Sequence, residues 1–162
     1  MTAAGTQVRL RPLRAADRVR VEAITRGVGL FRDDEIPVAL EVLEATAAAN
    51  DTYEGVAAEI DGVLVGWASW GPRAGTLGTW DLYWIVVDPS RHGDGIGTLL
   101  LAEMELRVTG RARLIVVETA GRPDYLPTRK FYERRGYHAV ATIPDFYAPG
   151  DDQVTFLKVL HS

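Results

Sequence analysis

Three glycines at alternate positions mark the segment of this sequence best suited to chemistry, His92-Gly-Asp-Gly-Ile-Gly-Thr98. Glycine lets backbone N–H groups point inward and lets a bulky anion approach the main chain. The segment lies between a strand-like run and a helix-like run, and a helix that begins here adds its unpaired N–H groups and positive dipole end. The pattern therefore predicts a backbone cradle for a phosphate or pyrophosphate group.

Two other anion-binding loops fit this segment less well. A Walker loop ends in Gly-Lys-Ser/Thr, and Gly97-Thr98 has no lysine before the threonine. A dinucleotide fingerprint needs G-x-G-x-x-G directly after a strand, whereas residues 88–92 intervene here and Thr98 takes the third glycine position. Glu118 lies near the distance expected for a ribose-binding acid, which keeps a nucleotide-binding regulatory domain as an alternative.

Carboxylates within or near apolar strands are the candidate catalytic bases. Asp81 lies in an apolar run, where burying a carboxylate without partners costs on the order of several kcal/mol. Its other interpretation is a charge near the exposed start of the strand. Glu118 ends the following strand, and ligands of open α/β sheets gather at such carboxyl ends. Glu35 is a third candidate, although an acid at a helix start is common for dipole reasons alone.

The elements that must position these groups follow from hydrophobic periodicity and turn residues. Helices are expected at 15–26, 35–49, 96–108 and 128–135, and strands at 8–10, 53–60, 63–70, 79–87, 114–119, 137–143 and 153–160. Asn50-Asp51 is expected to end the second helix, and residues 145–152 to form an acidic, aromatic loop. The order predicts an α/β fold with a mixed sheet, in which 79–119 makes a right-handed crossover.

Composition limits the protein class. A chain of 162 residues fits one domain, 1–162. The absence of cysteine excludes disulfides, thiolate metal sites and a cysteine nucleophile. A formal charge of −4 without a basic tract argues against a nucleic-acid partner. Met1–Arg9 has no apolar signal region and no run reaches membrane-spanning length, so we expect a cytoplasmic protein with no membrane partner and no metal.

Two motifs resemble those of the GNAT acyltransferase superfamily. The stretch 84–100 resembles its acetyl-CoA motif, Gln/Arg-x-x-Gly-x-Gly/Ala after a strand, and 130–137 looks like its Phe-Tyr helix followed by Gly and an aromatic residue. The resemblance implies a mostly antiparallel central sheet with one parallel, splayed strand pair, flanked by helices. It also implies direct transfer of an acetyl group from acetyl-CoA to a primary amine in a ternary complex, without a covalent enzyme intermediate.

The resemblance assigns roles by position. Tyr132 matches the family's general acid, and Asp81 falls where histone acetyltransferase relatives carry a catalytic glutamate. His92 stands where the family usually has Gln or Arg, and Tyr125 where many members have asparagine, so backbone amides are expected to hold most of the pyrophosphate. The residues expected at the coenzyme are Ile85, Val86, Val87, Arg91, His92, Gly93, Asp94, Gly95, Ile96, Gly97 and Thr98.

The acceptor amine stays open between small molecules, amino acids and peptides. Tyr83, Trp70 and Tyr125 are the candidate acceptor-binding residues, with Trp67 and Trp80 as further wall residues, because aromatic walls bind cations or apolar groups. Relatives are often dimers through their last strands, so a homodimer is a further expectation. The alternative function is an acyl-CoA-binding sensor or interaction module without turnover, which the presence of Tyr132 disfavours.

Overall fold

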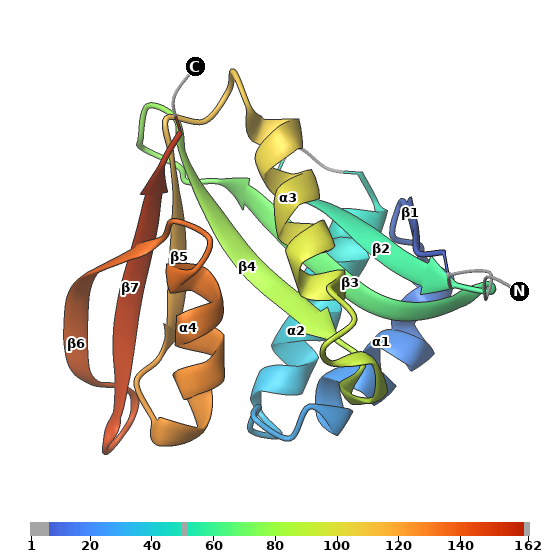
Figure 1. Cartoon of the computed structure of the whole chain (residues 1–162), viewed down its shortest axis with the longest axis horizontal. Helices are drawn as coiled ribbons and strands as arrows, with labels where there is room; N and C mark the ends of the chain where they lie inside the picture. Colours follow the sequence, from blue (N-terminus) through green and yellow to red (C-terminus); the bar gives the residue numbers. More distant parts are fainter. Residues whose placement is uncertain (1–6, 50–51, 161–162) are drawn as a thin grey trace, which may run out of the picture. The chain divides into compact units, whose positions relative to one another are not determined.

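The fold is a mixed α/β arrangement around one sheet, seen in a computed structural model that describes residues 7–49 and 52–160. The sheet order in this part of the chain is β1-β2-β3-β4-β5-β7-β6 (Figure 1). The strands are β1 (Arg9–Arg11), β2 (Glu54–Ile60), β3 (Val63–Pro72), β4 (Thr79–Val87), β5 (Leu114–Ala120), β6 (His138–Ala148) and β7 (Asp151–Val159). The helices are α1 (Arg18–Gly27), α2 (Glu35–Ala47), α3 (Ile96–Val108) and α4 (Leu126–Glu133).

Strand pairing confirms the predicted fold class. β4 and β5 pair in parallel, while β1–β2, β2–β3, β5–β7 and β6–β7 pair antiparallel. The predicted bounds of β4 and α3 are those observed. Two predictions involve residues outside the described ranges. One is the lack of an apolar signal region at Met1–Arg9, and the other is the end of the second helix at Asn50-Asp51. No helix in the described ranges has both the length and the apolar character needed to cross a membrane.

The chain forms two compact units, of which the first contains residues up to Trp70 together with Trp84–Arg107. Its core is built from one face each of α1 and α2 against the apolar residues of β2, β3 and the end of β4. Trp67 stacks on Trp84 with ring centroids 5.9 Å apart. α3 buries an apolar stripe whose spacing is that of a helix: Ile96, Leu100, Met104 and Val108.

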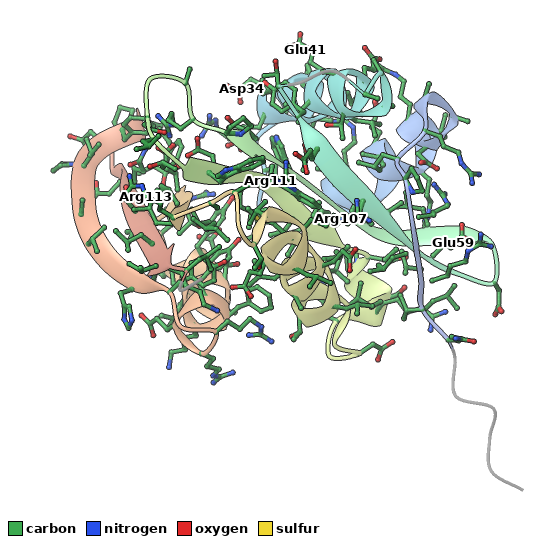
Figure 2. The ribbon with its side chains drawn as sticks, turned by 90° about the horizontal axis from the view of Figure 1, so that it is seen from above. Asp34, Glu41, Glu59, Arg107, Arg111 and Arg113 are labelled. Atoms are coloured by element: carbon green, nitrogen blue, oxygen red, sulfur yellow. The ribbon has the colours of Figure 1, made fainter. Side chains whose placement is uncertain are left out.

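The second unit contains Gly71–Tyr83 and Val108–Ser162. Its sheet segment buries Leu82, Val117 and Phe156, and Phe156 packs on Tyr132 of α4. Arg111 lies 4.7 Å from the Trp80 ring, and both it and Arg113 project from the segment after α3 (Figure 2). This packing fixes the first half of β4 and the whole of β5, which carry the candidate bases.

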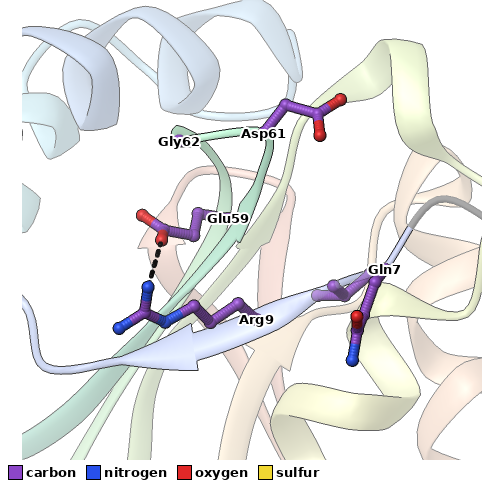
Figure 3. A pocket seen from close by; sticks show the side chains of 6 residues that line it. Gln7, Arg9, Glu59, Asp61 and Gly62 are labelled. Carbon is purple, nitrogen blue, oxygen red and sulfur yellow. Dashed lines mark ion pairs between the residues drawn. The ribbon is translucent and has the colours of Figure 1, made fainter.

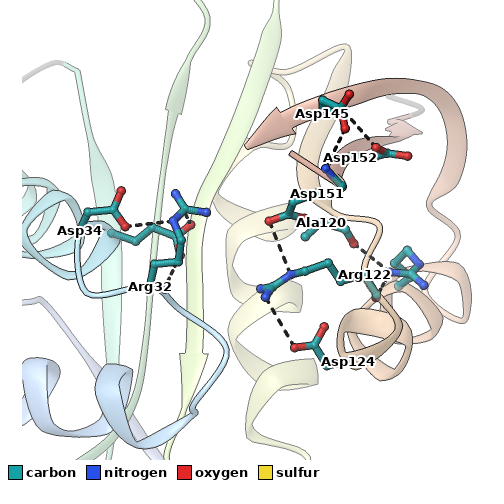
Figure 4. A network of polar contacts seen from close by, with 11 residues as sticks. Arg32, Asp34, Ala120, Arg122, Asp124, Asp145, Asp151 and Asp152 are labelled. Carbon is teal, nitrogen blue, oxygen red and sulfur yellow. Dashed lines mark hydrogen bonds and ion pairs between the residues drawn. The ribbon is translucent and has the colours of Figure 1, made fainter. Parts of the chain in front are cut away.

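The predicted loop at 145–152 is wrong in extent, because β6 runs on to Ala148 and β7 begins at Asp151. The pairing shifts between Ile143 and Ala148, and Asp145 has φ +56°. The Asp145 side chain accepts from the Gly150 amide at 2.7 Å, and its own amide donates to Asp152 at 3.0 Å (Figure 4). Pro144 lies within β6, and an edge strand tolerates the missing donor.

Two helix starts also differ from prediction. The first helical segment opens with a 3₁₀ turn, Ala15–Asp17, before α1. α4 begins two residues before the predicted start at Thr128, with Pro127 in its first turn. Proline is tolerated there because the first N–H groups of a helix have no intrahelical acceptor. The proline therefore belongs to the helix and does not mark the end of the preceding loop.

Candidate active site

The segment between β4 and α3 is held by its first residue, Asp88. The Asp88 amide donates to the Val65 carbonyl at 2.8 Å, and the carboxylate accepts from the Ser90 amide at 2.9 Å and from Arg20. Burial acts to raise the pKa of Asp88, but the hydrogen bonds from Ser90 and Arg20 outweigh it and lower the pKa below its ordinary value. Asp88 therefore stays anionic and anchors the loop.

The glycines that follow have the backbone geometry that an anion cradle requires. Gly93 and Gly95 have φ values of +91° and +80°, and a Cβ added at either would meet no heavy atom within 4 Å among the described residues. The Leu99 amide donates to the Gly95 carbonyl at 3.1 Å. The amides of Ile96 and Gly97 precede this bond and have no intrahelical acceptor. Open space thus lies beside the positive end of α3.

The side chains of this loop are engaged within it. His92 Nε2 lies 3.1 Å from the Val87 carbonyl oxygen, at the end of β4. The Arg91 guanidinium lies 3.8 Å from the Asp94 carboxylate. These contacts agree with the expectation that backbone amides, more than side chains, bind the pyrophosphate. The coenzyme roles of the loop and of Ile85, Val86 and Val87 stay predictions.

The parallel pairing of β4 with β5 stops before either strand ends. The ladder runs from Thr79–Leu114 to Leu82–Val117. β4 nevertheless continues to Val87 and β5 to Ala120. The predicted parallel pair is therefore confirmed as a short ladder whose strands extend beyond it, and its splay stays a prediction.

The second unit brings the two candidate bases together through a residue that the sequence did not single out, Arg73. Arg73 Nε and Nη2 donate to the two carboxylate oxygens of Asp81 at 2.7 and 2.8 Å. Nη2 also donates to Glu118 Oε1 at 3.3 Å. Asp81 is 3% exposed, whereas the side chains of Arg73 and Glu118 are 48% and 41% exposed. The hydrogen bonds that Arg73 donates to Asp81 raise the pKa of Arg73, so the guanidinium is permanently cationic.

These groups share one face of the sheet, and Tyr132 lies against the other. Asp81 alternates with Leu82 and Glu118 with Val117 along their strands, so each pair points to opposite faces. Val117 is opposite Phe156 in the register, and the Phe156 ring lies 6.0 Å from that of Tyr132. The acid and base candidates therefore approach the end of the ladder from opposite sides.

Tyr132 is buried among aromatic rings on α4. It is 3% exposed and makes edge contacts with Phe131 and Tyr137, at centroid distances of 5.3 and 5.7 Å. Burial raises its pKa well above the ordinary value near 10, because the phenolate would lose its hydration. The phenol is therefore protonated at neutral pH and able to donate a proton, as a general acid requires.

Exposure separates the aromatic candidates for acceptor binding. Tyr83 is 40% exposed on the face of Asp81, whereas Trp70 has no exposed surface and lies 6.0 Å from the Arg107 guanidinium. Tyr125 is buried beneath Arg122 at 5.0 Å. The burial of Trp70 disfavours its predicted acceptor contact. Acceptor binding by Tyr83 and Tyr125 stays a prediction.

Core packing also accounts for Trp67 and Trp80, which were predicted as further wall residues. Trp67 is buried and its Nε1 donates to Thr25 at 3.2 Å, and Trp80 is buried beneath Arg111. Glu35, the third base candidate, accepts from the Arg32 amide at 2.7 Å. Glu35 is the first residue of α2, and this contact at the helix start gives its carboxylate a structural role.

A surface depression of about 570 Å³ lies in the first unit, near the β2–β3 turn (Figure 3). Arg9 and Glu59 form an ion pair across it at 3.8 Å. Its lining residues are Gln7, Val8, Arg9, Glu59, Asp61 and Gly62. None of them is a predicted site residue.

The family follows from a sequence comparison. A family model described as an acetyltransferase (GNAT) domain matches residues 51–139. The chain belongs to the GNAT acetyltransferase family. A GNAT-family acetyltransferase structure from Desulfovibrio desulfuricans is 38% identical, covers 94% of this chain and 99% of its own, and has a TM-score of 0.86. This GNAT chain therefore shares the fold of its family, in which solved members bind coenzyme A or acetyl-CoA.

More distant matches vary in their named acceptors. S-(2-succino)cysteine N-acetyltransferase of Bacillus subtilis is 37% identical over 71 residues, which are 42% of this chain and 42% of that protein. The chain thus aligns with less than half of that relative. An acetyltransferase of Salmonella typhimurium, solved with acetyl-CoA, is 19% identical, covers 96% of this chain and 95% of its own, and has a TM-score of 0.74. Other structures with this fold are named for aminoglycosides or a ribosomal-protein alanine.

Arg73 and Asp88 are the functional residues that sequence reasoning missed. Arg73 lies in the segment 71–75, whose glycines and proline indicate only a turn. The one available signal was indirect, since a carboxylate inside an apolar strand needs a cation and Arg73 precedes Asp81 by eight residues. The sequence shows Asp88 only as the residue that follows the strand at 79–87. In the described ranges no cluster of His, Cys, Asp and Glu has the arrangement of a metal site.

Proposed function

We propose that this GNAT protein transfers an acetyl group from acetyl-CoA to a primary amine by direct attack in a ternary complex. The observation that carries the proposal is the pair of left-handed glycines, Gly93 and Gly95, with open space beside the Ile96 and Gly97 amides, which have no intrahelical acceptor. Backbone amides at a helix start suit a pyrophosphate. The pyrophosphate of the coenzyme is the ligand of this class that the family uses.

The transfer needs a neutral amine, a polarised thioester carbonyl and a proton for the leaving thiolate. The amine nitrogen bonds to the carbonyl carbon, the carbon–sulfur bond breaks, and Tyr132 donates its phenolic proton to the thiolate. The proton released by the amine passes to Glu118, which is half-exposed and lies on the opposite sheet face from Tyr132. The phenol regains its proton from solvent after the products leave.

Asp81 takes a supporting role in this scheme. Both of its carboxylate oxygens accept charge-assisted hydrogen bonds from Arg73, and it is buried. A carboxylate held in this way has a fixed orientation. We therefore assign the base to Glu118, and Asp81 holds Arg73 beside it.

The experiment measures acetyl transfer from radiolabelled acetyl-CoA to a panel of primary amines, with Tyr132→Phe as the test variant. Loss of a general acid lowers kcat by about 10²- to 10⁴-fold. Tyr137→Phe is the matched control, because it removes a hydroxyl from the same aromatic cluster and is expected to keep kcat within about threefold (order of magnitude). Wild-type kcat should show no alkaline decline from this phenol below pH of about 10.

Two results would contradict the proposal in different ways. Unchanged kcat for Tyr132→Phe at every pH would remove the tyrosine from the mechanism and leave the transfer itself standing. Coenzyme binding without transfer to any amine would favour the acyl-CoA-binding sensor. Preference for a nucleotide over coenzyme A in a binding titration would exclude both the acetyltransferase and the acyl-CoA-binding sensor.

A further inference from the structure

Arg73 is fixed in position by its main chain and its side chain together. Its amide donates to the Thr79 carbonyl at 2.8 Å, and its carbonyl accepts from Thr76 Oγ1 at 2.8 Å. Its guanidinium is bound in parallel by the Asp81 carboxylate, at 2.7 and 2.8 Å. A guanidinium ordered before binding loses less rotamer entropy when it meets an anion. Arg73 is therefore a preorganised cation.

Part of this guanidinium remains available. Arginine has five N–H groups, and here Nε and Nη2 bind Asp81 and Glu118. The two N–H groups of Nη1 have no acceptor among residues 7–49 and 52–160. The side chain is also 48% exposed. The free edge can therefore donate to a group that arrives from solvent.

The free Nη1 edge of Arg73 lies next to the Glu118 carboxylate, which is on the same face of the sheet as Asp81. Glu118 Oε1 is 3.3 Å from Arg73 Nη2, on the sheet face shared with Asp81. Asp81 balances the charge of Arg73, so the exposed surface offers a guanidinium edge beside a carboxylate. A ligand complementary to this pair carries a carboxylate and an ammonium close together. In an α-amino acid the two groups are attached to one carbon.

We propose that the acceptor is a free amino acid or a close derivative, whose carboxylate binds Arg73 Nη1 and whose amine lies at Glu118. This assignment rests on the proposed function and gives its substrate class. Glu118 pairs with the ammonium, which loses one proton to solvent, and it then takes the proton that the neutral amine releases on attack. Arg73 fixes the other end of the molecule and thereby orients the nitrogen.

The test compares kcat/KM for three matched acceptors: an amino acid, its carboxamide and the amine that lacks the carboxyl carbon. Alanine, alaninamide and ethylamine form one such series. A charge-assisted pair predicts that the acid is preferred over both by about 10- to 150-fold. A peptide amine has its carboxylate displaced by the chain, and it should be as poor as the amide.

The variants separate substrate binding from folding. Arg73→Met with Asp81→Asn removes the guanidinium without leaving a buried, unpaired charge, and it should abolish the preference for the acid. Arg73→Lys keeps the charge, loses the planar fork, and should restore only part of the preference. Arg134→Met, at the exposed end of α4 in the same unit, is the matched control and should keep all of it. Thermal unfolding of each variant establishes that it is folded.

Equal kcat/KM for the acid and the amide in the wild type would overturn the proposal, as would a preference that survives in the Arg73→Met/Asp81→Asn variant. Either result leaves acetyl transfer itself intact. If no amine is acetylated, calorimetry with free coenzyme A and alanine against alaninamide still decides. Binding of alanine alone, lost in the double variant, supports the carboxylate site, and equal or absent binding of both ligands refutes it.

Discussion

Replacing Gly95 with alanine tests the coenzyme loop most directly. Gly95 has φ +80°, and an added Cβ would meet nothing within 4 Å, so the folded chain pays for backbone strain alone. A left-handed conformation costs a residue with a Cβ about 1–2 kcal/mol. For a domain of this size that corresponds to a fall in Tm of about 2–8 °C. The fold should therefore survive the substitution.

Coenzyme binding should suffer more than stability does. The new methyl group enters the open space beside the amides that start α3, where we place the pyrophosphate. Loss of one charge-assisted hydrogen bond to that group is worth about 1.5–3 kcal/mol. The KM for acetyl-CoA should thus rise by about 10- to 150-fold, as measured by initial rates at saturating amine.

Gly29→Ala is the matched control for the Gly95 substitution. Gly29 lies in the same unit, has φ +75°, and also has nothing within 4 Å of an added Cβ. It should lose a similar Tm and keep the KM for acetyl-CoA. If Gly95→Ala loses stability as Gly29→Ala does and yet keeps its KM, the pyrophosphate does not lie over this loop and the reasoning fails.

Two further predictions concern stability in the first unit. Burial acts to raise the pKa of Asp17, but hydrogen bonds from Arg11 and the Arg14 amide outweigh it and lower the pKa. The contribution of Asp17 to the free energy of unfolding is therefore complete above pH of about 4 and is lost as the pH falls further. Asp17→Asn should therefore lose about 1.5–3 kcal/mol in urea unfolding at pH 7, and the difference from wild type should shrink at pH 3; a constant difference would argue against the ion pair. Gly55→Ala would bring a Cβ within 2.6 Å of the Ala68 carbonyl, so we expect a loss of about 1–3 kcal/mol by thermal unfolding, and an unchanged Tm would show that the strand can shift freely.

Local sequence signals predicted the parts of the fold that have clear boundaries. β4 ends and α3 begins where expected, because Asp88-Pro89 stops the strand pattern and Gly93 and Gly95 precede the helix pattern. β6 was cut short because Pro144 and Asp145 have turn propensity. Its edge position, which removes the need for a proline donor, is a property of the assembled sheet and could not be predicted from the strand alone.

The candidate site was predictable in its residue types and less so in its contacts. Asp81 was identified because a carboxylate inside an apolar strand needs a reason, and Glu118 because ligands of open α/β sheets gather at the carboxyl ends of strands. Their link through Arg73 depends on the β3–β4 connection and on the β4–β5 register, which a single sequence does not reveal. Trp70 illustrates the reverse problem, since an aromatic residue suited to a binding wall is equally suited to a core.

The Arg73–Asp81 pair also has a consequence for how the chain folds. Its partners are eight residues apart, whereas Arg73 and Glu118 are 45 apart. Closing the shorter loop costs about 1.5 kcal/mol less chain entropy, and loops of about ten residues close within about 10–100 ns. The hairpin can thus orient the guanidinium before β5 arrives with its carboxylate. The cation that we assign to substrate recognition is assembled by local contacts, and only its acidic neighbour waits for the long-range topology.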